Sequence, residues 1–221
     1  MTDRYSVVIP AFNSAAYIGA AIGSLLRQSL PPQRIIVVND GSTDDTAAVV
    51  EAIGGCVKLV SQENAGPGAA TTRGMALVDT PIMAFVDADD LWLDNKAALQ
   101  LSRLERESGL DGLFTHFFLS RTGEEPYQGL PVRPGWSRTT LMIRTESALR
   151  VGPMVDAPGR HGEAVDWIAR ARHIGLRLEM MQEVLAVRRV HEGSLTYRRS
   201  TGDAGYLAVA KAALDRRRSG G

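Results

Sequence analysis

The first 86 residues alternate between short apolar runs rich in β-branched residues and longer runs of helical character. Short apolar runs of this kind are typical of strands buried on both faces of a parallel sheet. The strand-like runs are 5–9, 34–38, 57–60 and 82–86, and the helix-like runs are 15–28, 44–52 and 69–78. Strands and helices in this order imply right-handed crossovers. They predict a Rossmann-like, mainly parallel central sheet with helices on both faces.

The rest of the chain is less regular, but no linker separates it from the first half. Its helix-like runs are 94–107, 145–151, 163–174 and 203–218, and its strand-like runs are 113–120, 139–144 and 184–190. Two segments rich in glycine and proline, 121–134 and 153–162, are expected to be loops. We therefore expect one α/β domain over residues 1–221.

The charge balance argues against a polyanion as partner. The chain has 25 basic and 25 acidic residues, whereas proteins that bind nucleic acid usually carry a basic excess. Its single cysteine, Cys56, can form neither an intrachain disulfide nor a zinc cluster. The sequence shows no signal-peptide pattern and no apolar stretch of about 18 residues. We expect a soluble, cytoplasmic protein with no nucleic-acid partner and no stable membrane insertion.

A cluster of carboxylates follows the apolar run 82–86. Residues 87–90 read Asp-Ala-Asp-Asp, so Asp87 and Asp89 lie one residue apart at an expected strand end. Such a pair can bind a hard divalent cation, Mg²⁺ or Mn²⁺, which also bridges to diphosphate oxygens. Aspartate is equally favoured in a turn before a helix, so the motif alone does not decide. The mutual repulsion of close carboxylates, which a cation offsets, favours the metal site.

A second acidic turn follows the strand expected at 34–38. Asp40 leaves the end of that strand, and Gly41 permits a tight turn. The Asp40 side chain could accept hydrogen bonds from a nucleobase N–H or a ribose hydroxyl. A capped turn explains the same residues and is the simpler interpretation of this segment taken alone.

The segment 64–71 contains part of a dinucleotide-binding pattern. Gly66 and Gly68 follow the third expected strand, but the third glycine of the fingerprint is missing because residue 71 is threonine. The fingerprint also normally follows the first strand of such a fold. Nicotinamide binding is therefore disfavoured.

Charged residues share one face of the helix expected at 163–174. Glu163, Asp166 and Arg170 are spaced at i, i+3 and i+7. A carboxylate here could remove a proton from an acceptor hydroxyl. The same spacing suits an acidic first helical turn with an Asp166–Arg170 ion pair, and spacing alone favours that structural role.

A histidine follows the last expected strand. His191 comes directly after the run 184–190. It could bind a metal or contact a phosphate, although a lone histidine more often does neither.

Together these segments resemble the family-2 glycosyltransferases, which have the GT-A fold. The resemblance spans about residues 5–198 and depends on the order and spacing of four elements. They are the first strand with its Pro-x-x-Asn turn at 6–13, the Asn-Asp-Gly-Ser-Thr-Asp turn at 39–44, the Asp-x-Asp segment at 85–92 and the His-x-x-Ser element at 191–194. The resemblance implies a nucleotide-sugar-binding half at about 1–95, an acceptor-binding half at about 96–200, and a C-terminal helix and tail at 201–221.

The resemblance also implies site residues and a mechanism. The residues assigned to the nucleotide are Pro10, Ala11, Asn13, Asp40, Thr71, Asp87 and Ala88. Asp89 and His191 would hold a divalent metal, Mn²⁺ or Mg²⁺. The mechanism of the family is inverting: a carboxylate base removes a proton from the acceptor, whose oxygen attacks the anomeric carbon opposite the departing diphosphate.

Two positions depart from the family pattern. The family often has Ala-Arg-Asn-x-Gly where this chain has Ala-Thr-Thr-Arg-Gly, so Thr71 replaces an arginine and cannot supply its charge. The family often has Glu-Asp at the start of the late helix, with the aspartate as base, but this chain has Ala164 at that place. The base is then Glu163 or Asp166, or it is absent. Asp166 is favoured because Trp167, beside it, could form an apolar wall of an acceptor pocket.

The leading hypothesis is a glycosyltransferase that moves a sugar from a nucleotide-diphosphate sugar, such as a UDP-sugar, to a saccharide, peptide or small-molecule acceptor. The alternative is a catalytically impaired nucleotide-sugar-binding module of the same fold, motivated by Thr71 and Ala164. A nucleotidyltransferase would usually need a basic, glycine-rich loop after the first strand, and residues 10–13 offer none. The acceptor is expected to contact the loops 121–135 and 153–162.

Overall fold

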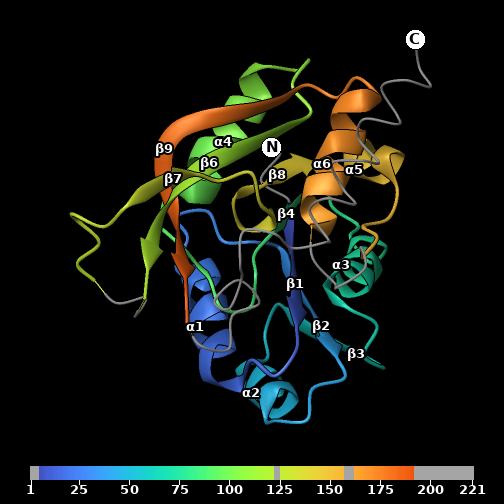
Figure 1. The fold of residues 1–221 in the computed structure, drawn as a ribbon, viewed down its shortest axis with the longest axis vertical. Helices are drawn as coiled ribbons and strands as arrows, with labels where there is room; N and C mark the ends of the chain where they lie inside the picture. The colour runs from blue at the N-terminus through green and yellow to red at the C-terminus, as the bar shows by residue number, and fades with distance from the viewer. Residues whose placement is uncertain (1–4, 122–124, 157–161, 192–221) are drawn as a thin grey trace.

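The computed structural model describes residues 5–121, 125–156 and 162–191, which form one sheet with helices packed on it (Figure 1). The strands are β1 (Tyr5–Ala11), β2 (Arg34–Asp40), β3 (Val57–Gln62), β4 (Ile82–Phe85), β5 (Leu91–Trp92), β6 (Gly112–Ser120), β7 (Val132–Pro134), β8 (Met142–Arg144) and β9 (Leu178–Arg189). The helices are α1 (Ala15–Leu26), α2 (Thr46–Ile53), α3 (Pro67–Met75), α4 (Lys96–Arg106), the 3₁₀ helix η1 (Arg138–Thr140), α5 (Thr145–Val151) and α6 (Glu163–His173). The helix expected at 203–218 lies outside the described residues. None of the described helices is long and apolar enough to cross a membrane.

The four strands expected in the first half form a parallel unit in the order β3-β2-β1-β4. Side chains of β1 alternate between the two faces of the sheet. Val7 and Ile9 pack in a cluster with α1, α2 and α4, whereas Val8 packs in another cluster with α3, α5 and α6. Helices therefore cover both faces, as expected. Because these strands are parallel, the segments that follow β1, β2 and β4 leave the same edge of the sheet.

The second half joins this unit through both antiparallel and parallel pairs, and it differs from expectation in three places. β8 is shorter than the strand expected at 139–144, because the start of that segment is η1. β7 pairs with β6 inside the segment expected to be a loop. β9 begins at Leu178, well before residue 184. Its first residues, Leu-Glu-Met-Met-Gln-Glu, lack β-branching, so only pairing with β6 reveals them as strand.

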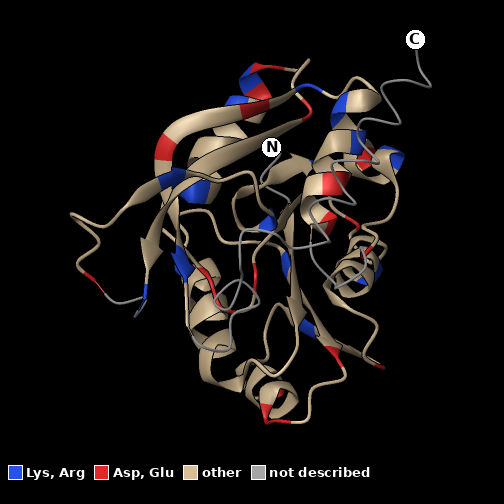
Figure 2. Cartoon of the chain, in the orientation of Figure 1, with Lys and Arg blue, Asp and Glu red and all other residues tan. Residues whose placement is uncertain are grey.

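Charged residues of both signs are interspersed along the described ribbon (Figure 2). Lys96, at the start of α4, is fully buried. Its Nζ lies 3.7 Å from the centroid of the Trp92 ring and donates to Gln100 Oε1 at 2.7 Å. Burial lowers the pKa of Lys96 well below its ordinary value of 10.5. Trp92 Nε1 in turn donates to Thr139 O, so this cluster supports η1.

We expect Lys96→Met to flatten the pH dependence of the unfolding free energy in the range below the ordinary lysine pKa of 10.5. A lysine with a lowered pKa binds fewer protons in the folded than in the unfolded state, so wild-type stability rises with pH across this window. Methionine has no titratable group, so this rise disappears. Urea unfolding at several pH values measures the slope, and Lys58→Met, at an exposed position of β3, is the matched control. An unchanged slope in Lys96→Met would contradict this account.

Candidate active site

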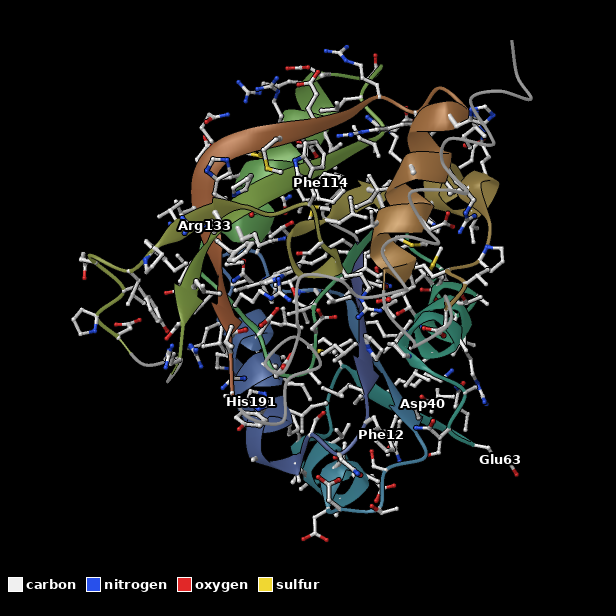
Figure 3. All side chains as sticks on the ribbon, viewed as in Figure 1. Phe12, Asp40, Glu63, Phe114, Arg133 and His191 are labelled. Carbon is white, nitrogen blue, oxygen red and sulfur yellow. The ribbon has the colours of Figure 1, made fainter. Side chains whose placement is uncertain are left out.

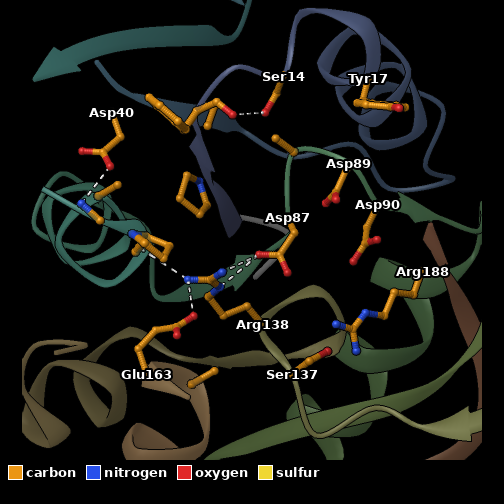
Figure 4. Close-up of a pocket in the computed structure, with 18 of the residues that line it drawn as sticks. Ser14, Tyr17, Asp40, Asp87, Asp89, Asp90, Ser137, Arg138, Glu163 and Arg188 are labelled. Carbon is orange, nitrogen blue, oxygen red and sulfur yellow. Dashed lines mark hydrogen bonds and ion pairs between the residues drawn. The ribbon is translucent and has the colours of Figure 1, made fainter. Parts of the chain in front are cut away.

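A pocket of about 410 Å³ opens at the edge of the sheet where β1, β2 and β4 end. One wall comes from the segments that follow these strands, and the other from η1, the start of α6 and the end of β9 (Figure 4). The expected site residues that line it are Pro10, Ala11, Asn13, Asp40, Asp87, Ala88, Asp89, Glu163 and His191. Thr71 and Asp166 do not line it. The strand-end motifs therefore converge as the parallel arrangement predicts.

The turns after β1 and β2 are bonded to each other. Asn13 has a φ of 46°, in the left-handed region, and its Oδ1 accepts a hydrogen bond from Thr43 N at 2.8 Å. In return, Asp44 Oδ2 accepts a hydrogen bond at 3.0 Å from Ala15 N, at the first residue of α1. Two motifs that are separate in the sequence are thus one structural unit, which holds Asn13 at the pocket wall.

Asp40 at the end of β2 is 3% exposed and orders the loop that follows β3. Its Oδ1 accepts hydrogen bonds from Gln62 Nε2 at 2.7 Å and Ala65 N at 2.9 Å, and its Oδ2 accepts one from Gly66 N at 2.9 Å. Since a carboxylate oxygen has two lone pairs, Oδ2 can accept one further hydrogen bond. Asp40 lies on the α3 side of the molecule, and His191 lies on the α1 side (Figure 3).

The carboxylates of residues 87–90 do not act as one cluster. Asp90 is 2% exposed, and its oxygens accept hydrogen bonds from Thr139 Oγ1 at 2.5 Å and Arg189 N at 3.0 Å. Burial, and then the charges of its acidic neighbours, raise the pKa of Asp90 well above its ordinary value. Asp90 therefore anchors this turn to η1 and β9, although it borders the pocket.

Asp89 and His191 form the pair best placed to hold a metal. His191 Nε2 lies 3.2 Å from Asp89 Oδ2, and the His191 ring stacks on Tyr17 of α1 at a centroid distance of 4.1 Å. Burial, followed by the charge of Asp87, raises the pKa of Asp89. A divalent cation would offset both the burial and the repulsion.

This donor set fits a cation that a substrate helps to hold. Within the described residues, no group of three or more His, Cys, Asp or Glu side chains could ligate a metal alone. Hard divalent cations are commonly bound by one or two protein ligands, with substrate phosphates and water completing the shell. Asp89 and His191 offer such a pair, so the geometry suits a metal that binds together with a diphosphate.

A buried arginine that no sequence motif marks joins the two walls of the pocket. Arg138 of η1 is 8% exposed, and its Nε and Nη2 lie 3.0 and 2.9 Å from Asp87 Oδ1. Its Nη1 lies 3.1 Å from Glu163 Oε1 and donates to Thr71 Oγ1 at 3.1 Å. Burial acts to lower the pKa of Arg138, but Asp87 and Glu163 outweigh it and raise the pKa. The guanidinium therefore stays charged.

The two candidate bases on α6 have different surroundings. Glu163 is 7% exposed and lines the pocket, whereas Asp166 forms an ion pair with Arg170 at 2.9 Å. The expectation that Trp167 forms a wall of the acceptor pocket is wrong. Trp167 is fully buried in the core, and its Nε1 donates to Gly152 O at 2.9 Å. The structure therefore brings Glu163, and not Asp166, to the pocket.

The glycines of the partial dinucleotide pattern have a structural role. The Asp156 carboxylate accepts hydrogen bonds from Gly68 N at 3.0 Å and Ala69 N at 3.1 Å, at the N-terminus of α3. A Cβ on Gly66 would lie 2.6 Å from Asp156 Oδ2, and one on Gly68 would lie 2.9 Å from it. The chain's own carboxylate thus occupies the helix end that a cofactor phosphate would use.

Comparison with known sequences gives one family. The model of Glycosyl transferase family 2 matches residues 6–155. Over 102 residues the chain is 35% identical to UDP-Glc:alpha-D-GlcNAc-diphosphoundecaprenol beta-1,3-glucosyltransferase WfgD of Escherichia coli, a match that covers 45% of this chain and 40% of that protein. The chain spans less than half the length of the curated relatives it matches.

Solved structures of similar fold cover nearly the whole chain. S. aureus TarS 1–349 in complex with UDP-GlcNAc matches with a TM-score of 0.76 at 20% identity, covering 96% of this chain and 66% of that one. The mannosyltransferase PcManGT from Pyrobaculum calidifontis, in complex with GDP-Man and Mn²⁺, matches with a TM-score of 0.69 at 16% identity, covering 98% of this chain and 75% of that one. At these identities the likeness shows the fold, and it confirms the expected α/β domain of GT-A type.

Proposed function

The chain belongs to glycosyltransferase family 2, and we propose on that premise that it transfers a sugar from a UDP-sugar to an acceptor hydroxyl, with inversion at the anomeric carbon. The observation that carries this proposal is the composition of the pocket. One cavity of about 410 Å³ holds Asp40, the Asp89–His191 pair and Glu163. These groups suit, in turn, a nucleotide, a metal-bound diphosphate and an acceptor hydroxyl. A UDP-linked donor is supported by the name of WfgD and by the TarS complex.

On the donor side, the nucleobase and ribose would contact the turn after β1 and the end of β2. The residues assigned to them are Pro10, Ala11, Asn13 and Asp40, with Asp87 and Ala88 toward the ribose. Asp87 uses Oδ1 for Arg138, so we assign its Oδ2 to the donor. Thr71 lies outside the pocket lining and would act through Arg138.

On the acceptor side, Glu163 is the proposed base. Its Oε1 faces Arg138, which leaves Oε2 to take the proton from the acceptor hydroxyl. The acceptor oxygen then bonds to the anomeric carbon, and the bond from that carbon to the diphosphate breaks on the opposite side with its electron pair on the diphosphate. A divalent cation held by Asp89 and His191 would supply charge stabilisation to that leaving group.

The acceptor would approach over the exposed apolar rim beside Glu163. Trp136 and Val165 both line the pocket and are 38% and 42% exposed. The Trp136 ring packs against the Phe114 ring at a centroid distance of 4.7 Å. The Cζ atom of Arg172 lies 4.2 Å from the centroid of the Trp136 ring, so both neighbours fix its position. A rigid aromatic edge of this kind can order an acceptor at little entropic cost.

A donor screen tests the proposed function. We expect a UDP-sugar to bind in calorimetry when Mn²⁺ is present, and free UDP to appear when the matching acceptor is supplied. Binding without turnover across a broad acceptor panel would favour the catalytically impaired module, for which Ala164 and the paired state of Glu163 argue. If no nucleotide sugar bound, both the enzyme and the module would be ruled out.

A further inference from the structure

Arg138 contacts three segments that are far apart in the sequence. Its guanidinium meets Asp87 after β4 and Glu163 at the start of α6 (Figure 4). It also donates to Thr71 in α3. All three contacts are between 2.9 and 3.1 Å. One side chain thus spans the donor wall and the acceptor wall of the pocket.

A buried guanidinium is costly unless its charge and its N–H groups are satisfied. Here one carboxylate from each wall pairs with the same guanidinium, so the two walls share one cation. The planar guanidinium of arginine also fixes the directions of its hydrogen bonds. Nε and Nη2 point at Asp87, while Nη1 points at Glu163. Moving either carboxylate would therefore disturb the other.

We propose that Arg138 is a positioning residue that holds the base Glu163 in a fixed place relative to the donor-side Asp87. This inference rests on the proposed function. Arg138 takes Oδ1 of Asp87 and Oε1 of Glu163, and so orients the second oxygen of each carboxylate for substrate. Its role is to act through these two carboxylates and not to touch the reacting atoms.

The positioning role of Arg138 can be tested by moving the guanidinium from position 138 to position 71. Since Thr71 Oγ1 lies 3.1 Å from Nη1 of Arg138, an arginine at position 71 could place its guanidinium in the space that truncation of residue 138 leaves. The double variant Thr71→Arg/Arg138→Ala should then recover part of what Arg138→Ala loses. A residue needed only for packing in η1 would not be replaced from α3.

The experiment measures the affinity for UDP in Mn²⁺ by calorimetry and kcat for UDP release at saturating donor. We expect Arg138→Ala to weaken UDP binding by about tenfold, through Asp87, and to lower kcat by about a hundredfold, through Glu163. The double variant should regain at least about tenfold in kcat over Arg138→Ala. Arg34→Ala, which breaks the exposed Arg34–Asp79 pair, is the matched control and should behave as wild type.

Arg138→Lys carries the test if Arg138→Ala does not fold. A lysine keeps the buried charge but is a point donor that cannot hold both carboxylates, so we expect one of the two properties to fall and the other to persist. Wild-type values of both in Arg138→Lys would overturn the proposal, as would a kcat in folded Arg138→Ala within about threefold of wild type. Failure of the proposed function is distinguishable. Wild-type protein that binds UDP without turnover would overturn that function. The UDP affinity of the Arg138 variants would still test the contact between Arg138 and Asp87.

Discussion

Asp89→Ala is expected to abolish metal-dependent nucleotide binding while the fold stays intact. Asp89 Oδ2 lies 3.2 Å from His191 Nε2, and among the described residues no third acidic, imidazole or thiol side chain completes a metal site with them. Loss of one of the two proposed metal ligands should weaken UDP binding in Mn²⁺ by about a hundredfold or more. Calorimetry with UDP, in Mn²⁺ and then in a chelator, isolates the metal-dependent part of the affinity.

Without metal, this variant should be no less stable than wild type at neutral pH. Burial, and then Asp87, raise the pKa of Asp89 in the folded state. Such a group contributes stability only at low pH, and that stability is lost as the pH rises through the folded pKa. Urea unfolding in a chelator at about pH 7 tests this, and Asp79→Ala, at an exposed ion pair, is the control that should keep UDP binding. Unchanged UDP affinity in Asp89→Ala would show the metal assignment to be wrong.

The place of the candidate site could be predicted because parallel strands end at one edge of a sheet. Asp40 and Asp89 each follow an apolar strand, and the structure brings both to one pocket. The different roles of Asp89 and Asp90 could not be predicted. Asp90 is removed from the pocket chemistry by Thr139 and Arg189, partners that lie 49 and 99 residues along the chain. Hydrogen bonds of such sequence separation leave no local pattern.

Arg138 was missed for the same reason. It follows a polar, glycine-containing segment, and its carboxylate partner Asp87 lies 51 residues away. The strand β9 shows the equivalent limit for the fold, since its first half has no β-branched residue and is defined by pairing with β6. The spacing of apolar residues reveals helices and strands that bury one apolar face. It does not reveal strands that are defined by pairing with a neighbouring strand.

The choice between Glu163 and Asp166, in contrast, had a signal in the sequence. Glu163 and Trp167 are separated by four residues, so they lie on the same face of α6. Trp167 is fully buried in the core, which turns Glu163, one turn earlier, inward at the pocket edge. Reading the tryptophan as a core residue would have favoured Glu163. Reading it as a substrate wall favoured Asp166.

Glu163→Gln should therefore lower kcat by about a thousandfold while UDP affinity in Mn²⁺ changes little. Glutamine keeps the shape of the side chain and an oxygen that can accept from Arg138, but it cannot take the proton of the acceptor. The loss should appear in kcat and not in the KM for the donor, because in the proposed mechanism Glu163 acts only after the donor is bound. Initial rates at saturating donor, with UDP affinity measured on the same preparation, separate the two effects.

Asp166→Asn is the matched control, since it removes a carboxylate one turn along the same helix. Asp166 does not line the pocket and pairs with Arg170 at 2.9 Å, while Arg170 donates to Val151 O at 2.7 Å. Its loss should cost about 1 kcal/mol of unfolding free energy and leave kcat within about threefold of wild type. If Asp166→Asn stopped turnover and Glu163→Gln did not, Asp166 would be the base, and α6 would have to turn Trp167 out of the core to present it.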